Sequence, residues 1–181
     1  MEYILIAIVV LILIVIIISV SNKLNKAIVK IDEAASGIDV ALSKRYDVLI
    51  KMMDVVKAYT KHEKDTFFEV INLRKNMSID EKKIENQKMD DNFSKINVVA
   101  ENYPELKANT NFSELSEELR NTENKISFSR QFYNDSVTMY NTKLELFPSN
   151  IVAGMFNFTP RELFAAESDE ARKNVKVSFD K

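Results

Sequence analysis

The stretch FSELSEELRNTENKISFSRQFYNDSVTMYNTKLELF, residues 112–147, decides the fold class of this chain. Eleven of its positions follow one another at intervals of three or four residues, and nine of the eleven are apolar or aromatic. Those positions are Phe112, Leu115, Leu119, Thr122, Ile126, Arg130, Tyr133, Val137, Tyr140, Leu144 and Phe147. Such spacing places side chains on one face of an α-helix. It predicts a helix of about 36 residues with one buried face, which Pro148 ends or kinks.

The same spacing appears nearer the N-terminus, in and around IDVALSKRYDVLIKMMDVVKAYTKHE, residues 38–63. It predicts a long helix over residues 24–75, about 78 Å in length at 1.5 Å per residue. Gly37 is its one weak point, since glycine inside a helix costs about 1 kcal/mol relative to alanine; alternatively, it lets a neighbour pack closely. The apolar positions are Ile28, Ile31, Ala35, Ile38, Leu42, Leu49, Val56 and Tyr59.

Local capping signals predict two further helices. Ser78 and Glu81 form a capping box, so a helix is expected to begin there. It should reach a loop expected over residues 104–114, in which Asn111 caps the next helix. Residues 159–162, Thr-Pro-Arg-Glu, combine a threonine N-cap with proline at the first helical position, which predicts a short last helix.

The composition agrees with a few long helices. The chain has 181 residues with only 2 Gly and 3 Pro, whereas strands joined by tight turns need many more of both. The predicted fold is all-α: an N-terminal transmembrane helix followed by an antiparallel bundle of three long helices and one short one. The first long helix is expected to lead away from the membrane, the second to return, the third to lead away again and the last to fold back. Residues 175–181 alternate apolar and polar, so this tail is expected to be extended.

The first residues predict a membrane anchor. YILIAIVVLILIVIIISVSN, residues 3–22, contains no charged residue. About 20 apolar residues suffice to cross the hydrocarbon of a bilayer as a helix. The alternative is a cleaved secretory signal, but no positive charge precedes the segment and it is longer than the apolar core of a signal peptide. We therefore expect an uncleaved anchor over residues 1–22.

The flanking charges predict the orientation of this anchor. Lys23, Lys26 and Lys30 follow the segment, and positive flanks remain in the cytoplasm. A short N-terminus is therefore expected outside, with the Tyr3 ring at the outer interface, and residues 23–181 are expected to form a cytoplasmic bundle.

The sequence offers little for catalysis. It has no cysteine and one histidine, His62, which excludes thiolate chemistry and the histidine-carboxylate metal sites of helical bundles. The formal net charge is −2, so a nucleic-acid partner is not expected. We expect no enzyme, no cofactor and no metal, and the most interesting residues are instead charges on the apolar faces.

Five charged residues are predicted to form an inter-helix polar cluster. Arg45 and Arg130 each occupy an apolar position of a helical face, Glu123 lies seven residues before Arg130, and Asp39 and Asp47 flank Arg45. Burying an arginine without a partner is costly, so carboxylates should lie close to it. Ion pairs that fix the register of the helices are the preferred interpretation; a polar ligand site between helices is the alternative. Three asparagines beside the same face are expected either to bridge helices or to be simply exposed: Asn124, Asn134 and Asn141.

Taken together, these residues resemble the LemA family of bacterial proteins. The stretch of residues 38–63 is similar to the opening motif of the family, and residues 103–158 resemble its second half almost throughout. The chain departs from the family where proline is usual, at Ile50 and Val175, and where glycine is frequent, at Ala58. The shared pieces are Tyr103-Pro104, Leu106-Lys107-Ala108, Phe112, Leu115, Glu123-Asn124-Lys125-Ile126, Arg130, Tyr133-Asn134, Tyr140-Asn141 and Phe147-Pro148.

The resemblance implies a membrane-tethered helical bundle in a bacterial cell membrane, and it implies no catalytic residues. One branch of the family is associated with magnetosome membranes, which hints at membrane organisation. The first functional hypothesis is a scaffold or adaptor that binds the bilayer and an unidentified protein. The alternative is a membrane-tethered regulator or ligand sensor. The apolar face from Ile28 to Ile38 extends beyond the helices expected to cover it, so it either pairs with a second copy of the chain or is covered by the last helix and the tail.

Overall fold

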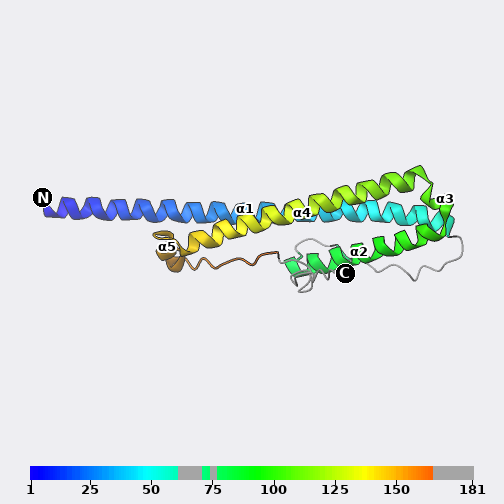
Figure 1. Ribbon diagram of the computed structural model, residues 1–181. Helices are drawn as coiled ribbons and strands as arrows, with labels where there is room; N and C mark the ends of the chain where they lie inside the picture. Colours follow the sequence, from blue (N-terminus) through cyan, green and yellow to red (C-terminus); the bar gives the residue numbers. More distant parts are fainter. Residues whose placement is uncertain (61–70, 74–76, 165–181) are drawn as a thin grey trace, which may run out of the picture.

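The computed structural model describes residues 1–60, 71–73 and 77–164, and these contain five α-helices and no strand (Figure 1). The all-α prediction is therefore confirmed: long helices pack against one another behind an apolar N-terminal segment. The helices are α1 (Glu2–Tyr59), α2 (Ile79–Asn102), α3 (Pro104–Lys107), α4 (Thr110–Glu145) and α5 (Ser149–Met155).

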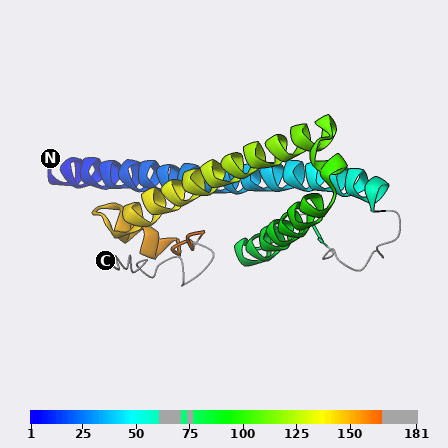
Figure 2. The ribbon, with the colours of Figure 1, turned by 45° about the vertical axis from the view of Figure 1, so that its right-hand side comes forward.

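The two longest helices, α1 and α4, form an antiparallel pair that is the axis of the molecule (Figures 1 and 2). α4 has 36 residues, as the spacing predicts, and the part of α1 from residue 24 to residue 59 has the same length. Each is about 54 Å long at 1.5 Å per residue. On the surface of this pair Lys44 and Glu118 form an ion pair of 2.7 Å. Their mutual hydrogen bond raises the pKa of Lys44 and lowers that of Glu118.

The second long helix runs in the same direction as the first. Asp39 of α1 pairs with Lys82 of α2, and Arg45 of α1 pairs with Asp90 further along α2. Residue numbers thus increase in the same direction along both helices. α2 is therefore parallel to α1 and does not return along it as expected. The expected return relied on a helix that continues to residue 75, whereas α1 ends at Tyr59. The nineteen residues from 60 to 78 are long enough to lead back along α1 before α2 begins.

Two apolar clusters follow one another along α1. Near the N-terminal end, α1 residues from Val20 to Leu42 pack with α4, α5 and Phe164. Near the far end, α1 residues from Val48 to Val56 pack with α2, α3 and the first part of α4. The face from Ile28 to Ile38 is covered by the first cluster, because α4 is as long as the part of α1 that it accompanies. This face gives no reason to expect a second copy of the chain.

Local signals predicted some helix ends correctly and others wrongly. The capping box of α2 is present, with Ser78 N donating to Glu81 Oε2 (2.8 Å) and Glu81 N donating to Ser78 Oγ (3.2 Å). The expected loop after α2 contains a helical turn, α3, whose Leu106 is fully buried. The cap of α4 is Asn109, which accepts from Phe112 N (3.1 Å), so the expectation for Asn111 is wrong.

The last helix that was expected to begin at residues 159–162 does not begin there, and the chain from residue 157 to residue 164 is not helical. Its backbone is instead hydrogen-bonded by side chains of α4, an arrangement described below. A short helix, α5, precedes it in the stretch that follows Pro148. The tail of residues 175–181 lies outside the described residues.

The apolar segment of residues 3–22 is the first part of α1, and α1 continues from it without a break. This is one helix near the N-terminus, long and apolar enough to cross a membrane by length and composition. Nearly all its side chains up to residue 19 are exposed, whereas those of a core helix would be covered by protein.

Candidate functional site

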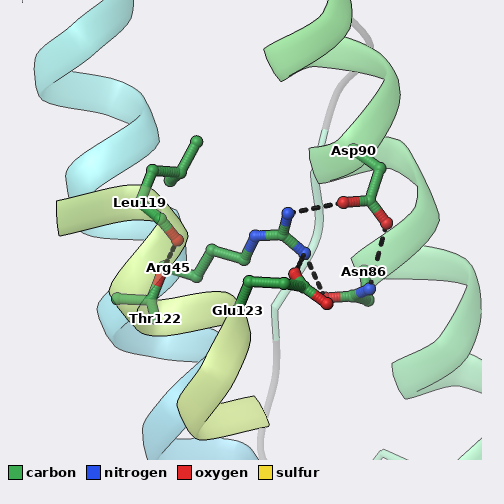
Figure 3. A network of polar contacts seen from close by, with 6 residues as sticks. All are labelled: Arg45, Asn86, Asp90, Leu119, Thr122 and Glu123. Atoms are coloured by element: carbon green, nitrogen blue, oxygen red, sulfur yellow. Dashed lines mark hydrogen bonds and ion pairs between the residues drawn. The ribbon is translucent and has the colours of Figure 1, made fainter. Parts of the chain in front are cut away.

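Arg45 of α1 is the centre of a polar cluster between three helices (Figure 3). Its side chain is only 3% exposed. Nη1 donates to Asn86 Oδ1 of α2 (2.7 Å), and Nη2 donates to Asp90 Oδ1 one turn later (2.5 Å). Nη1 also lies 2.7 Å from Glu123 Oε2 of α4, an ion pair without the angles of a hydrogen bond. Asn86 donates to Asp90 (3.2 Å) and holds that carboxylate in place. We call Arg45, Asn86, Asp90 and Glu123 the Arg45 cluster.

The Arg45 cluster joins helices without forming an enclosed charge network. Asp90 and Glu123 are 41% and 43% exposed, so water reaches both carboxylates while the guanidinium is buried. A buried ion pair adds little net stability, because the desolvation cost offsets the attraction, but it penalises arrangements that leave the charge unpaired. We therefore expect the cluster to fix the register of α1, α2 and α4 more than it stabilises them.

A second set of polar contacts lies next to this cluster, in the first half of α2. Lys82 is 4% exposed; its Nζ pairs with Asp39 (2.7 Å) and donates to the carbonyl oxygen of Ala35 (3.4 Å). Glu85 pairs with Lys88 (2.7 Å) and accepts from Asn72 N (2.7 Å). These contacts attach the first, polar half of α2 to its neighbours.

At the other end of α4, two Tyr-Asn pairs hold an extended segment. Asn134 forms two hydrogen bonds with the backbone of Phe164, accepting from N (2.7 Å) and donating to O (3.0 Å). Asn141 does the same with Arg161, at 2.9 Å for each bond. The hydroxyl groups of the neighbouring tyrosines donate to two more backbone carbonyl oxygens at 3.0 Å, Tyr133 to Glu162 and Tyr140 to Thr159.

The spacing of these contacts has a simple geometric reason. The two pairs are seven residues apart on α4, which is about 10.5 Å along a helix. Their backbone partners are three residues apart, which is about 10 Å along an extended chain. The two spacings therefore match, so the two Tyr-Asn pairs bind the segment at successive points along its backbone. Burial raises the pKa of both tyrosine hydroxyls, so they remain protonated donors.

The described residues form hollows on their surface. Three hollows of 280, 540 and 620 Å³ lie on their surface, and none of the three is lined by Arg45, Asp90 or Glu123. In the part of the chain that the structure describes, no three His, Asp or Glu side chains are grouped as metal ligands. His62 lies outside that part.

Comparison with known proteins decides the family. The LemA family model matches residues 34–179. Protein LemA of Metamycoplasma hominis is 31% identical over 162 residues, which cover 87% of this chain and 74% of that protein. The chain belongs to the LemA family. The matched range begins within α1 at residue 34, so it includes the Arg45 cluster and the Tyr-Asn pairs but not the apolar segment.

The structure brings together part of the cluster predicted from the sequence of this LemA family member. Arg45 and Glu123 are paired, whereas Asp39 pairs with Lys82 instead. Asp47 is exposed and acts on Lys44 only through its charge. Arg130 lies two turns beyond Glu123 on α4, where its guanidinium is stacked 4.8 Å from the ring centre of Phe164.

Sequence reasoning missed the partners that α2 supplies. Asn86 is fully buried and Asp90 half exposed, although both lie in a mostly polar stretch, residues 80–92. The position of Arg45 on the apolar face of α1 could have indicated these partners. A buried arginine on that face requires acceptors from the helix that covers it. Asn134 and Asn141 form bridges, as predicted, but each bridges α4 to the extended segment and not to another helix. Asn124 is exposed.

Proposed function

We propose that this LemA family protein is a non-enzymatic scaffold or adaptor, which a single transmembrane helix anchors in a bacterial cell membrane. The observation that carries the proposal is the continuity of α1: its exposed apolar part and its packed part belong to one helix of 58 residues. A helix that passes unbroken from lipid into a bundle holds the bundle in a fixed orientation to the membrane. That property suits a protein whose task is to position partners.

The proposed topology places the N-terminus outside and residues 23–181 in the cytoplasm. Lys23 and Lys26 follow the apolar segment and keep that side cytoplasmic, while Tyr3, which is exposed, lies at the outer interface. The partners in this proposal are the bilayer and an unidentified protein. Nucleic acid is not among them, because the net charge is −2.

The topology is tested with single cysteines, since the chain has none of its own. Glu2→Cys should react with a membrane-impermeant maleimide in intact cells. Glu117→Cys, at an exposed position of α4, should react only after permeabilisation. The reverse pattern would contradict the orientation, and recovery of the protein in the soluble fraction would contradict the anchor.

The adaptor role is tested by proximity labelling from a C-terminal fusion. The matched control is the same label fused to residues 1–30, which carry the anchor and its lysines without the bundle. We expect a reproducible set of neighbours that the control does not label. Identical neighbours for both fusions would mean that the bundle selects no partner.

A second candidate function is a membrane-tethered regulator or ligand sensor. It is favoured by one observation: Arg45 Nε is buried without a hydrogen-bond partner in the part of the chain described, next to two half-exposed carboxylates. A thermal-shift screen against metabolites and metal ions separates the two functions. A ligand at 100 times its Kd stabilises a protein by about 2.7 kcal/mol, whereas a pure scaffold should not respond.

A further inference from the structure

The end of the bundle that carries α5 has an uncharged, apolar surface. Residues 146–160 contain no Asp, Glu, Lys or Arg. Five of their large apolar side chains are between 53% and 79% exposed: Leu146, Phe147, Ile151, Met155 and Phe156. We call residues 146–160 the apolar tip. Exposed apolar side chains gathered in this way mark an interaction surface.

The apolar tip lies beside the end of the apolar segment of α1 (Figures 1 and 2). Val152 and Ala153, on the buried side of α5, belong to the same core cluster as Val20 and Leu24, and Ile17 packs against that cluster. The tip is thus at the level where the membrane-crossing stretch gives way to lysines. A surface at this level meets the bilayer before it meets any soluble protein.

Four lysines lie at the same level of the molecule as the tip and supply positive charge there. Lys23, Lys26 and Lys30 of α1 and Lys143 of α4 line the hollow of 280 Å³. None of the four forms an ion pair with a carboxylate of the described residues. No acidic residue occurs between residues 3 and 31. We call these four residues the lysine hollow; its positive charge is uncompensated at the height of the lipid head groups.

We propose that the apolar tip and the lysine hollow together form a docking surface for anionic phospholipid, with the tip inserted into the membrane interface beside the transmembrane helix. This inference rests on the proposed anchor, since α1 brings both features to the bilayer. Apolar side chains of an interfacial helix enter the boundary between head groups and acyl chains, while lysines bind the phosphates around them. The bundle then has two attachments to the membrane, which prevents it from rotating or tilting about the single helix.

The absence of tryptophan from the chain makes insertion measurable. Three single-tryptophan variants of the full chain are reconstituted in vesicles that contain phospholipid with brominated acyl chains. Phe147→Trp reports on the tip, and Ile12→Trp reports on the apolar segment. Phe128→Trp is the matched control, because Phe128 is 71% exposed and lines the same hollow as Gly37, about 22 Å past residue 22 along α1.

We expect bromine to quench Phe147→Trp and Ile12→Trp and to leave Phe128→Trp unquenched. Quenching of Ile12→Trp without Phe147→Trp would overturn the docking surface and leave the anchor intact. A blue-shifted but unquenched Phe147→Trp would also overturn it, since a second copy of the chain would then cover the tip. If Ile12→Trp is itself unquenched, the proposed anchor fails together with the inference.

The charge preference is tested with the same Phe147→Trp reporter. Brominated phosphatidylglycerol and brominated phosphatidylcholine are each added at the same fraction to mixed vesicles. The anionic lipid should quench more strongly, since each lysine near an anionic surface contributes about fivefold to the local preference. Replacing the lysine hollow by glutamine should abolish the difference, and equal quenching in the native chain would overturn the role of the lysines.

The matched control replaces four other exposed lysines by glutamine, Lys51, Lys57, Lys107 and Lys125, so that the change in total charge is the same. The preference for phosphatidylglycerol should survive in this variant. Its loss would mean that net charge alone attracts the lipid, which would overturn the specific site.

Discussion

Arg45 occupies a position that the helical period assigns to the core, and it is as buried there as its apolar neighbours. The carboxylates that accompany it are half exposed. The two sides of the interaction therefore differ in what they lose when a partner is removed: the carboxylates regain water, whereas the guanidinium does not.

This asymmetry predicts unequal effects of mutation. Asp90→Ala combined with Glu123→Ala leaves a buried cation without its carboxylates and should lower the free energy of unfolding by about 3 kcal/mol. Arg45→Met fills similar space without the charge and should cost about 1 kcal/mol or less. Denaturant unfolding in detergent measures both. A larger loss for Arg45→Met would show that the arginine itself stabilises the fold.

Gly37 lies inside α1 with room for a side chain. A Cβ at this position would be 4.0 Å from Ser129 Oγ, an ordinary contact, so the glycine is not required for close packing. Gly37→Ala should raise the free energy of unfolding by about 0.5 to 1 kcal/mol, because alanine restricts the unfolded chain and favours the helix. Thermal unfolding checks the direction. A decrease would mean that α4 approaches α1 more closely than this distance indicates.

At the scale of elements, the Tyr-Asn pairs decide the conformation of the segment they hold. Asn134→Ala removes a donor and an acceptor and leaves two backbone groups of Phe164 without partners. It should expose residues 159–164 to faster hydrogen exchange, with a loss of about 1 kcal/mol per hydrogen bond. Asn124→Ala, at an exposed position of the same helix, is the control and should leave exchange unchanged.

The same pairs predict a dependence on alkaline pH. Burial raises the pKa of Tyr133 and Tyr140 above the ordinary value of 10.0, so the folded state binds the phenolic protons more tightly than the unfolded state. Their contribution to stability is fully present below pH 10 and is lost as pH rises through the raised pKa values. Unfolding measured from pH 8 to pH 12 should show this loss. A variant with Tyr133→Phe and Tyr140→Phe, which cannot ionise there, should show a smaller loss.

Periodicity predicts α4 correctly, and the capping box predicts the start of α2 correctly, because both signals lie within the element itself. The end of α1 is different: apolar spacing continues past Tyr59 although the helix does not. The direction of α2 depends on the connection before it, which the period does not describe. The capping signal at residues 159–162 is overridden because α4 binds that backbone, a long-range effect absent from the local sequence.

The same contrast between local signals and long-range effects applies to the candidate site. Arg45 and Glu123 were identifiable because each interrupts or borders an apolar face. Asn86, Asp90 and Lys82 were not, since polar residues on a polar helix look alike whether water or a neighbouring helix receives them.

For the whole molecule, the proposed orientation of the bundle depends on α1 being one rigid helix. Its first third is apolar and exposed, and the remainder packs along nearly its whole length. The apolar tip and the lysine hollow lie where these parts meet. Under the proposed anchor, we expect an unbroken α1 to fix the orientation of the bundle relative to the bilayer, whereas a hinge would uncouple the two.

The most direct test is a distance across that junction, in the full chain in lipid nanodiscs. Val9→Cys and Ser43→Cys are exposed positions on either side of it, and spin labels attach there alone because the chain has no other cysteine. Thirty-four residues of unbroken helix span about 51 Å. Pulsed electron–electron double resonance should give one narrow distribution of distances between the two spin labels, centred near this value. A broad distribution centred at a much shorter distance would contradict the account.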